Sequence, residues 1–194
     1  MSWYEGDTLM QILETVEIAN DPNFEDMRFP VQFVNRPNLN FRGYCGTLAA
    51  GILKPGNDIT VLPSGKESKI KSLVTYEGEL DQAIPGEAIT VTLEDEIDVS
   101  RGDMIVHSNH HQPHVSSQFK AMVVWMTEQP LVAGKQYSIK VGVSESNGSL
   151  TGIDYQIDVN TLQHNQASEL KLNEIGLCEF SLNKPVVFDT YKRN

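Results

Sequence analysis

The sequence has few cysteines, no long apolar run and no phosphate-binding G-x-x-x-x-G-K-[ST] motif. Cys45 and Cys178 are the two cysteines, and both sit inside apolar runs. This pattern favours buried free thiols over a disulfide framework. No window approaches the roughly 20 apolar residues of a membrane span, and the N-terminus carries no basic stretch followed by an apolar one. These absences predict a cytoplasmic protein without a membrane partner.

Basic residues are also scarce. The chain has 194 residues and a formal net charge of −11, and residues 1–106 hold 18 acidic against 8 basic side chains. Binding to nucleic acid requires clustered Lys and Arg that neutralise phosphates, and the sequence has no such cluster. The acidic balance therefore predicts a solvated surface or a basic protein partner, and no nucleic acid.

Short strands broken by proline and glycine dominate residues 30–65. Lys54-Pro55-Gly56-Asn57 is typical of a tight turn, because Pro presets φ at the second position and Gly tolerates positive φ at the third. Pro63-Ser64-Gly65 predicts a second turn of this kind. Short strands separated by frequent proline–glycine turns predict a closed antiparallel barrel.

The rest of the chain divides around this stretch. Residues 1–26 are expected to form a connector, with a short helix opened by a Thr8–Gln11 capping box. We predict a first barrel over 27–107, a His-rich linker over 108–114 and a second barrel over 115–194. Asn147-Gly148 predicts a hairpin turn in the second barrel. A hydrophobic content of 40% is enough to bury a core in each barrel.

Particular strings resemble a known family. Phe41-Arg42-Gly43, the GTLAAG run at 46–51 and the LKPGND run at 53–58 resemble the second, barrel domain of elongation-factor-type GTPases. The fuller string MRFPVQFVNRPNLNFRGYCGTL at 27–48 resembles the large, GTPase subunit of bacterial sulfate adenylyltransferase, and the resemblance runs over 3–194. It implies an all-β fold of two consecutive antiparallel barrels, of the domain 2 and domain 3 type, after a short helix.

The resemblance also implies a function. In that family a heterodimer forms with a smaller catalytic subunit, which makes adenosine 5′-phosphosulfate from ATP and sulfate in sulfate assimilation, while GTP hydrolysis in the large subunit drives this nucleotidyltransferase reaction. GTP and Mg²⁺ would belong to a GTPase domain that this sequence lacks. We therefore expect this part to be non-catalytic and free of cofactors. In the family roughly two more strands follow the segment that resembles 188–194, so we expect the second barrel to lack its final strands and to have an open edge.

A histidine cluster offers the main alternative chemistry. His107, His110, His111 and His114 fall within eight residues, and imidazoles at such spacing can bind zinc or nickel. We interpret the cluster as linker, because no cysteine or further histidine stands near it in the sequence. Neither cysteine has a nucleophile motif around it. We therefore predict no catalytic, cofactor-binding or metal-ligating residue.

An interface is the better prediction for four polar residues near one barrel connection. Arg36, Asn38, Asn40 and Arg42 lie there, and the two arginines are among the few bases of the acidic half. Arginine can bind carboxylates or phosphates with two parallel hydrogen bonds. The alternative is that both merely balance local acids. Two other functions stay open: a translation-factor-type barrel pair contacting tRNA or the ribosome, and a small metal-binding protein using residues 107–114.

Overall fold

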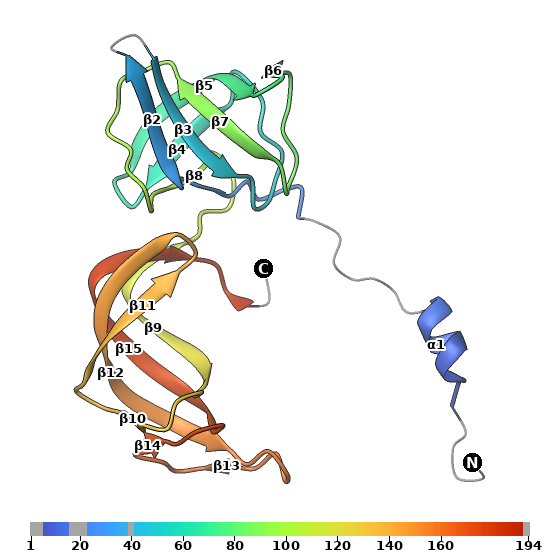
Figure 1. Cartoon of the computed structure of the whole chain (residues 1–194), viewed down its shortest axis with the longest axis vertical. Coiled ribbons are helices and arrows are strands. Elements are labelled where there is room, and N and C mark those ends of the chain that lie inside the picture. The colour runs from blue at the N-terminus through green and yellow to red at the C-terminus, as the bar shows by residue number, and fades with distance from the viewer. Residues whose placement is uncertain (1–5, 16–22, 39–40, 192–194) are drawn as a thin grey trace.

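The computed structural model describes residues 6–15, 23–38 and 41–191. These residues form one short helix and two main antiparallel sheets, one after the other along the chain (Figure 1). The helix is α1 (Leu9–Thr15). The first sheet contains β1 (Phe29–Pro30), β2 (Phe33–Asn38), β3 (Phe41–Thr47), β4 (Asp58–Leu62), β5 (Lys66–Thr75), β6 (Gly78–Leu80), β7 (Ala88–Leu93) and β8 (Met104–His107).

The first sheet curls back on itself. Its hydrogen-bonded path runs β1-β8-β4-β5-β7-β3-β2, with β6 added beside β5. No strand pairing joins β1 to β2 in the described residues, so the path has two ends. Those ends are neighbours in sequence, because only Val31 and Gln32 separate them. The Val31 N–H donates to the backbone carbonyl of Asp103, next to β8, and the Gln32 N–H donates to the backbone carbonyl of Cys45 on β3. The two edges of the sheet therefore meet at these two residues.

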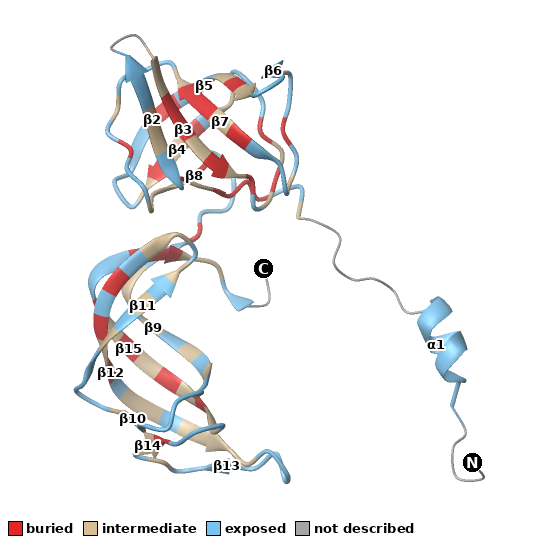
Figure 2. Cartoon of the chain, viewed as in Figure 1, coloured by how far each residue is buried: buried red, intermediate tan, exposed pale blue. Residues whose placement is uncertain are grey.

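Alternating side chains build the core inside this curl. In β4, Ile59 and Val61 are buried while their neighbours are not, which is the period of two expected of a strand with one face inward. Figure 2 shows buried segments on most strands of this sheet. The buried apolar side chains that pack together include Met27, Phe29, Tyr44, Leu48, Leu53, Ile70, Leu73, Val91 and Ile105.

The predicted Pro-Gly turn and the capping box are both confirmed. The Asn57 N–H donates to the Lys54 carbonyl at 3.2 Å, which closes the turn around Pro55-Gly56. The Thr8 N–H donates to Gln11 Oε1 at 2.9 Å, and the Gln11 N–H to Thr8 Oγ1 at 3.3 Å. All residues of α1 are nevertheless exposed, so the helix is stabilised by its capping box and not by packing against a sheet. No helix in the described ranges is long and apolar enough to span a bilayer.

One predicted connection is instead strand. Arg36-Pro37-Asn38 belongs to β2, because Asn38 pairs with Phe41 of β3 and Asn35 with Gly43. A register shift between Asn35 and Asn38 lets the hairpin continue past Pro37. Asn40, which we predicted at the interface, lies outside the described residues.

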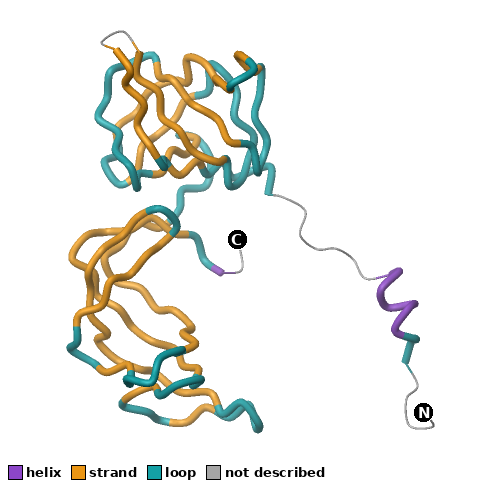
Figure 3. Tube along the Cα trace, viewed as in Figure 1, coloured by secondary structure: helices purple, strands orange, loops and turns teal. Residues whose placement is uncertain are grey.

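The second sheet is built from three long strands. Its path runs β11-β12-β15-β9, with β13 beside β12, and β10 and β14 pair separately. Within the described chain no pairing joins β9 to β11, so this sheet has two edges. Its strands are β9 (His114–Val124), β11 (Gln136–Val141), β12 (Ser144–Ile157), β13 (His164–Asn165) and β15 (Ile175–Phe188), and the separate pair consists of β10 (Leu131–Val132) and β14 (Glu169–Leu170). Figure 3 shows the loops gathered at the strand ends.

The hairpin turn predicted at Asn147-Gly148 is wrong. Those residues lie inside β12, and the chain reverses between Val141 and Ser144, which pair with each other. Gly142, with φ of 58°, occupies the tight turn. Gly148 has a different reason to be glycine: a Cβ there would meet the Ser181 carbonyl oxygen at 2.6 Å. Close approach of β15, rather than a turn, requires the missing side chain.

The all-β, antiparallel fold class predicted from the sequence is thus confirmed. The second sheet has a smaller core than the first, centred on Leu131, Leu150, Leu170, Cys178 and Phe180. Half-buried aromatic and aliphatic side chains extend it, and Phe119 stacks on Phe180 with ring centroids 5.6 Å apart. These contacts hold β9, β12 and β15 together.

Candidate functional site

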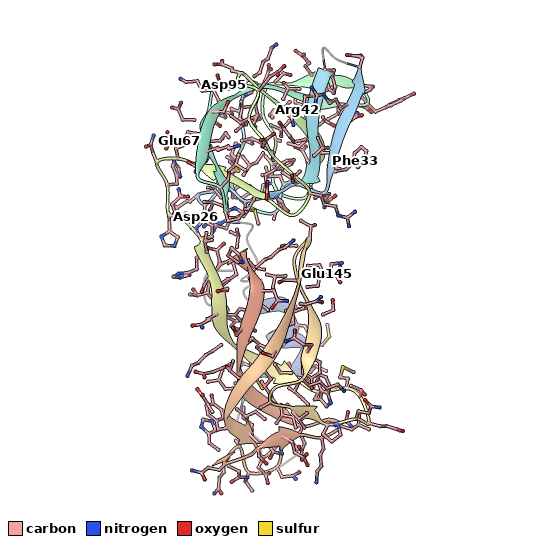
Figure 4. All side chains as sticks on the ribbon, turned by 90° about the vertical axis from the view of Figure 1, so that its left-hand side faces the viewer. Asp26, Phe33, Arg42, Glu67, Asp95 and Glu145 are labelled. Carbon is pink, nitrogen blue, oxygen red and sulfur yellow. The ribbon has the colours of Figure 1, made fainter. Side chains whose placement is uncertain are left out.

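The structure brings the two predicted interface arginines to one groove. Arg36 and Asn38 are exposed on β2, and Arg42 lies on the adjoining strand β3. Arg36 and Arg42 both line a cavity of about 340 Å³, whose floor includes Tyr44. Figure 4 shows Arg42 in the half of the first sheet that is remote from the second sheet. The site therefore faces away from the junction between the sheets.

Arg42 keeps unused hydrogen-bonding capacity. Its side chain is 25% exposed, and its nearest carboxylate is Asp98 Oδ1, 3.7 Å from a terminal nitrogen. Its Nε is buried and makes no hydrogen bond within the described residues. A buried donor left without a partner costs about 1–3 kcal/mol. Because that Nε is buried, only the partly exposed terminal nitrogens of Arg42 can be reached by a ligand or a protein.

Tyr44 fixes the position of this guanidinium. The Arg42 Cζ lies 6.0 Å from the centroid of the Tyr44 ring, in cation–π range. The Tyr44 hydroxyl donates to the Ile97 carbonyl at 3.1 Å, and burial raises the pKa of Tyr44 so that this proton is retained. The groove also carries Lys71 and four carboxylates, from Glu79, Glu94, Asp95 and Glu96. Such mixed charge suits a polar protein surface better than a single anion.

The histidine cluster lies at a different place, in a cavity of about 700 Å³ that His107, His110 and His111 help to line. The rings of His107 and His110 are 4.8 Å apart. His107 Nε2 lies 3.1 Å from the Ile52 carbonyl oxygen, and His110 Nδ1 lies 3.1 Å from that of Glu25. His114 instead contacts Phe188.

These histidines do not converge on one point. Among the described residues, no three His, Cys, Asp or Glu side chains are placed to share a metal ion. Burial lowers the pKa of His107, and so favours its neutral form near neutral pH. The geometry fits packing between the end of β8 and the start of β9.

Neither cysteine is placed for nucleophilic chemistry. Cys45 Sγ lies 3.3 Å from the Thr90 hydroxyl, which is no general base. Cys178 is fully buried, and burial raises the pKa of its thiol to about 11. A thiolate at neutral pH is therefore strongly disfavoured there. Both side chains act as packing groups.

Sequence reasoning missed the residue that joins the two sheets. Arg28 Nε donates to Asp189 Oδ2 at 2.7 Å, and a terminal nitrogen donates to Oδ1 at 3.0 Å. The same guanidinium also donates to the carbonyls of Met27 and His111. The two side chains are only 7% and 18% exposed. A lone arginine inside the apolar run of 27–31 was the one local signal, but its partner is 161 residues away.

Known proteins resemble both sheets. The family model "GTP-eEF1A C-terminal domain-like" matches residues 118–194. Sulfate adenylyltransferase subunit 1 of Teredinibacter turnerae is 52% identical over 99% of this chain and 41% of its own length. The same subunit of Chromobacterium violaceum is 53% identical over 98% of this chain and 40% of its own length. The chain thus spans about two fifths of these relatives.

A solved structure supports the fold alone. Sup35 complexed with GDP superposes with a TM-score of 0.79 over 99% of this chain and 47% of that one, at 15% identity. The fold is therefore that of translation-factor domains, whereas the sequence similarity is to sulfate adenylyltransferase subunit 1 along both sheets. Over its described sheets and nearly its whole length, the chain is accordingly homologous to about two fifths of sulfate adenylyltransferase subunit 1.

Proposed function

We propose that this chain is a non-catalytic β portion of sulfate adenylyltransferase subunit 1, in a cytoplasmic complex that couples GTP hydrolysis to the synthesis of adenosine 5′-phosphosulfate from ATP and sulfate. The observation that carries the proposal is identity of 52% sustained over 99% of the chain, rather than over one motif. In this proposal GTP and Mg²⁺ bind to a GTPase domain in another part of the whole protein.

The two sheets would act as a lever between that GTPase domain and the small catalytic subunit. A lever must keep its two arms in a fixed orientation, and the bidentate pair of Arg28 and Asp189 ties the first sheet to the end of the last strand. Rigid-body movement of packed domains is a common way to transmit a nucleotide switch. The chemical step would then take place in the small catalytic subunit, and the two sheets would hold that subunit and the GTPase domain in a defined relative orientation.

Arg36, Asn38 and Arg42 are the residues we propose to contact the partner. Arg36 forms no ion pair with another described residue, and the one ion pair of Arg42 is the long 3.7 Å contact with the exposed Asp98. Each guanidinium can therefore receive a carboxylate from another protein without first breaking a close internal pair. Asn38 stands beside them at the tip of the β2–β3 hairpin.

A binding measurement with the small subunit tests the proposal. We expect the 194-residue chain and the whole subunit 1 to be retained by immobilised small subunit, and Arg36→Glu/Arg42→Glu to weaken both by about tenfold or more, as loss of interfacial charge pairs does. Lys54→Glu/Lys69→Glu is the matched control, because it reverses two charges of the same sheet outside the groove. Melting temperatures of all variants establish that they fold.

Two results would contradict the proposal. The first is the absence of retention for the chain and the whole subunit alike. The second is tight binding of transfer RNA by this chain in a filter assay with a steep salt dependence, which would favour a translation-factor role, since phosphate contacts release counterions. If the groove variant and the control variant weaken binding to the small subunit equally, the groove is not the contact surface. The proposed role within the family would still stand.

A further inference from the structure

A cleft between the two sheets differs in charge from the other cavities. It has a volume of about 570 Å³, and Arg101, Lys140 and Lys184 line it together with Asp103 and Glu145. Four other cavities in the described part of the chain have at least as many carboxylates as cationic side chains on their walls. In a protein of net charge −11, a cleft with an excess of cations is the exception.

The three cations are not neutralised internally. No ion pair joins Arg101, Lys140 or Lys184 to a carboxylate among the residues that the structure describes. Lys140 lies opposite Glu145 in the β11–β12 pairing, yet the two side chains form no ion pair. Like charges gathered at one cavity repel one another, so a bound anion would relieve this repulsion.

The two carboxylates of the cleft are already engaged by neutral donors. Asp103 accepts the Ser100 N–H at 2.8 Å. Glu145 accepts the Ser138 hydroxyl at 2.6 Å, and Figure 4 shows it at the end of the second sheet that faces the first. Both carboxylates keep their negative charge, so the cleft has an excess of one cationic side chain, and none of its three cations forms an ion pair with either carboxylate in the described chain.

The walls of the cleft come from both sheets. Arg101 follows β7 in the first sheet, whereas Lys140 is on β11 and Lys184 on β15. The sheets touch at its edge, where a Cβ on Gly102 would lie 3.6 Å from the Cα of Ser144. A ligand held by cations of both sheets would bind one orientation of the sheets better than others.

We propose that this inter-sheet cleft binds a small polyanion bearing phosphate or sulfate groups, held by Arg101 from one sheet and by Lys140 and Lys184 from the other. Three unpaired cations on separate segments offer several points of attachment, which a ligand with several anionic groups can use at once and a single monovalent anion cannot. Binding would stabilise the arrangement of the two sheets that places these side chains around one cavity. The proposal does not depend on the function given above.

Calorimetric titration of the 194-residue chain with tripolyphosphate tests this site. We expect saturable binding that weakens with added salt. Arg101→Gln/Lys184→Gln should reduce the affinity by about tenfold or more, because each substitution removes one charge-assisted hydrogen bond to the ligand. The control Lys54→Gln/Lys135→Gln also removes one cation from each sheet, and neither lysine lines the cleft. Its affinity should stay within about twofold of the unmodified chain.

Nuclear magnetic resonance locates the binding. Tripolyphosphate should shift the backbone amide signals of Gly102 and Ser144, which line the cleft from the two sides. Inorganic sulfate is the second probe, and we expect it to bind more weakly. Absence of binding at millimolar tripolyphosphate, equal losses in the cleft and control variants, or equal affinity for sulfate would each overturn the proposal.

Discussion

Replacing Asp189 by asparagine tests whether the junction between the sheets is held by charge. Asp189→Asn keeps the size of the side chain but removes the negative charge that faces Arg28. The Arg28 side chain is 7% exposed, so water cannot readily take the place of the carboxylate. Removing one partner of a buried ion pair costs about 3–5 kcal/mol, because the other charge stays buried without compensation.

We expect the lower end of that range, about 3 kcal/mol, for two structural reasons. Asp189 is 18% exposed and thus partly hydrated, and Arg28 retains hydrogen bonds to the Met27 and His111 carbonyls. For a chain of this length 1 kcal/mol shifts the midpoint of thermal unfolding by about 2–4 °C. Differential scanning calorimetry should therefore show a midpoint lower by roughly 6–12 °C.

Two further variants make the reasoning refutable. Asp98→Asn removes a carboxylate that is 85% exposed and 3.4 Å from Lys66, and should change stability by less than about 1 kcal/mol. Arg28→Met/Asp189→Leu removes both charges and should recover most of the loss, as apolar replacement of a buried pair often does. If Asp189→Asn shifts the midpoint no more than Asp98→Asn does, the pair does not hold the junction.

Three further predictions concern single sites. Gly148→Ala should destabilise the chain by about 1–3 kcal/mol in urea unfolding, because its Cβ would meet the Ser181 carbonyl; Gly152→Ala, with its nearest atom at 3.8 Å, is the control. Burial puts the pKa of His107 in the fold below its ordinary value of 6.5, so the unfolded chain binds the proton first. The contribution of neutral His107 to the free energy of unfolding is therefore complete above about pH 6.5 and is lost as the pH falls below that value. The free energy of unfolding of a His107→Gln variant should depend less on pH below about pH 6.5. Cys178 should react with a thiol reagent at pH 8 only in denaturant, since burial raises its pKa to about 11; reaction in the native chain would contradict this.

Local chemistry was enough to predict several elements. Proline and glycine predicted short strands within residues 30–65, and Pro55-Gly56 predicted the turn before Asp58–Leu62. Thr8 and Gln11 predicted their own reciprocal hydrogen bonds. In each case the groups that interact are within a few residues of one another, so the sequence contains both partners.

The same local logic failed where a distant strand intervened. Asn147-Gly148 has the composition of a hairpin turn, yet β15 passes so close to Gly148 that the glycine serves strand packing instead. Arg36 and Asn38 were expected in a connection and lie in β2, because their register with β3 decides the outcome. Short-range propensity was overridden by pairing with another strand.

The sequence by itself determined the all-β class, the turn before β4 and the acidic character of the surface, because each depends on neighbouring residues or on composition. Only the tertiary structure decided that Arg28 pairs with Asp189 and that Arg101 shares a cleft with Lys140 and Lys184. These side chains are far apart along the chain and meet only after two sheets have formed and docked. Long-range electrostatic contacts of this kind follow from the folded geometry, which no local pattern specifies.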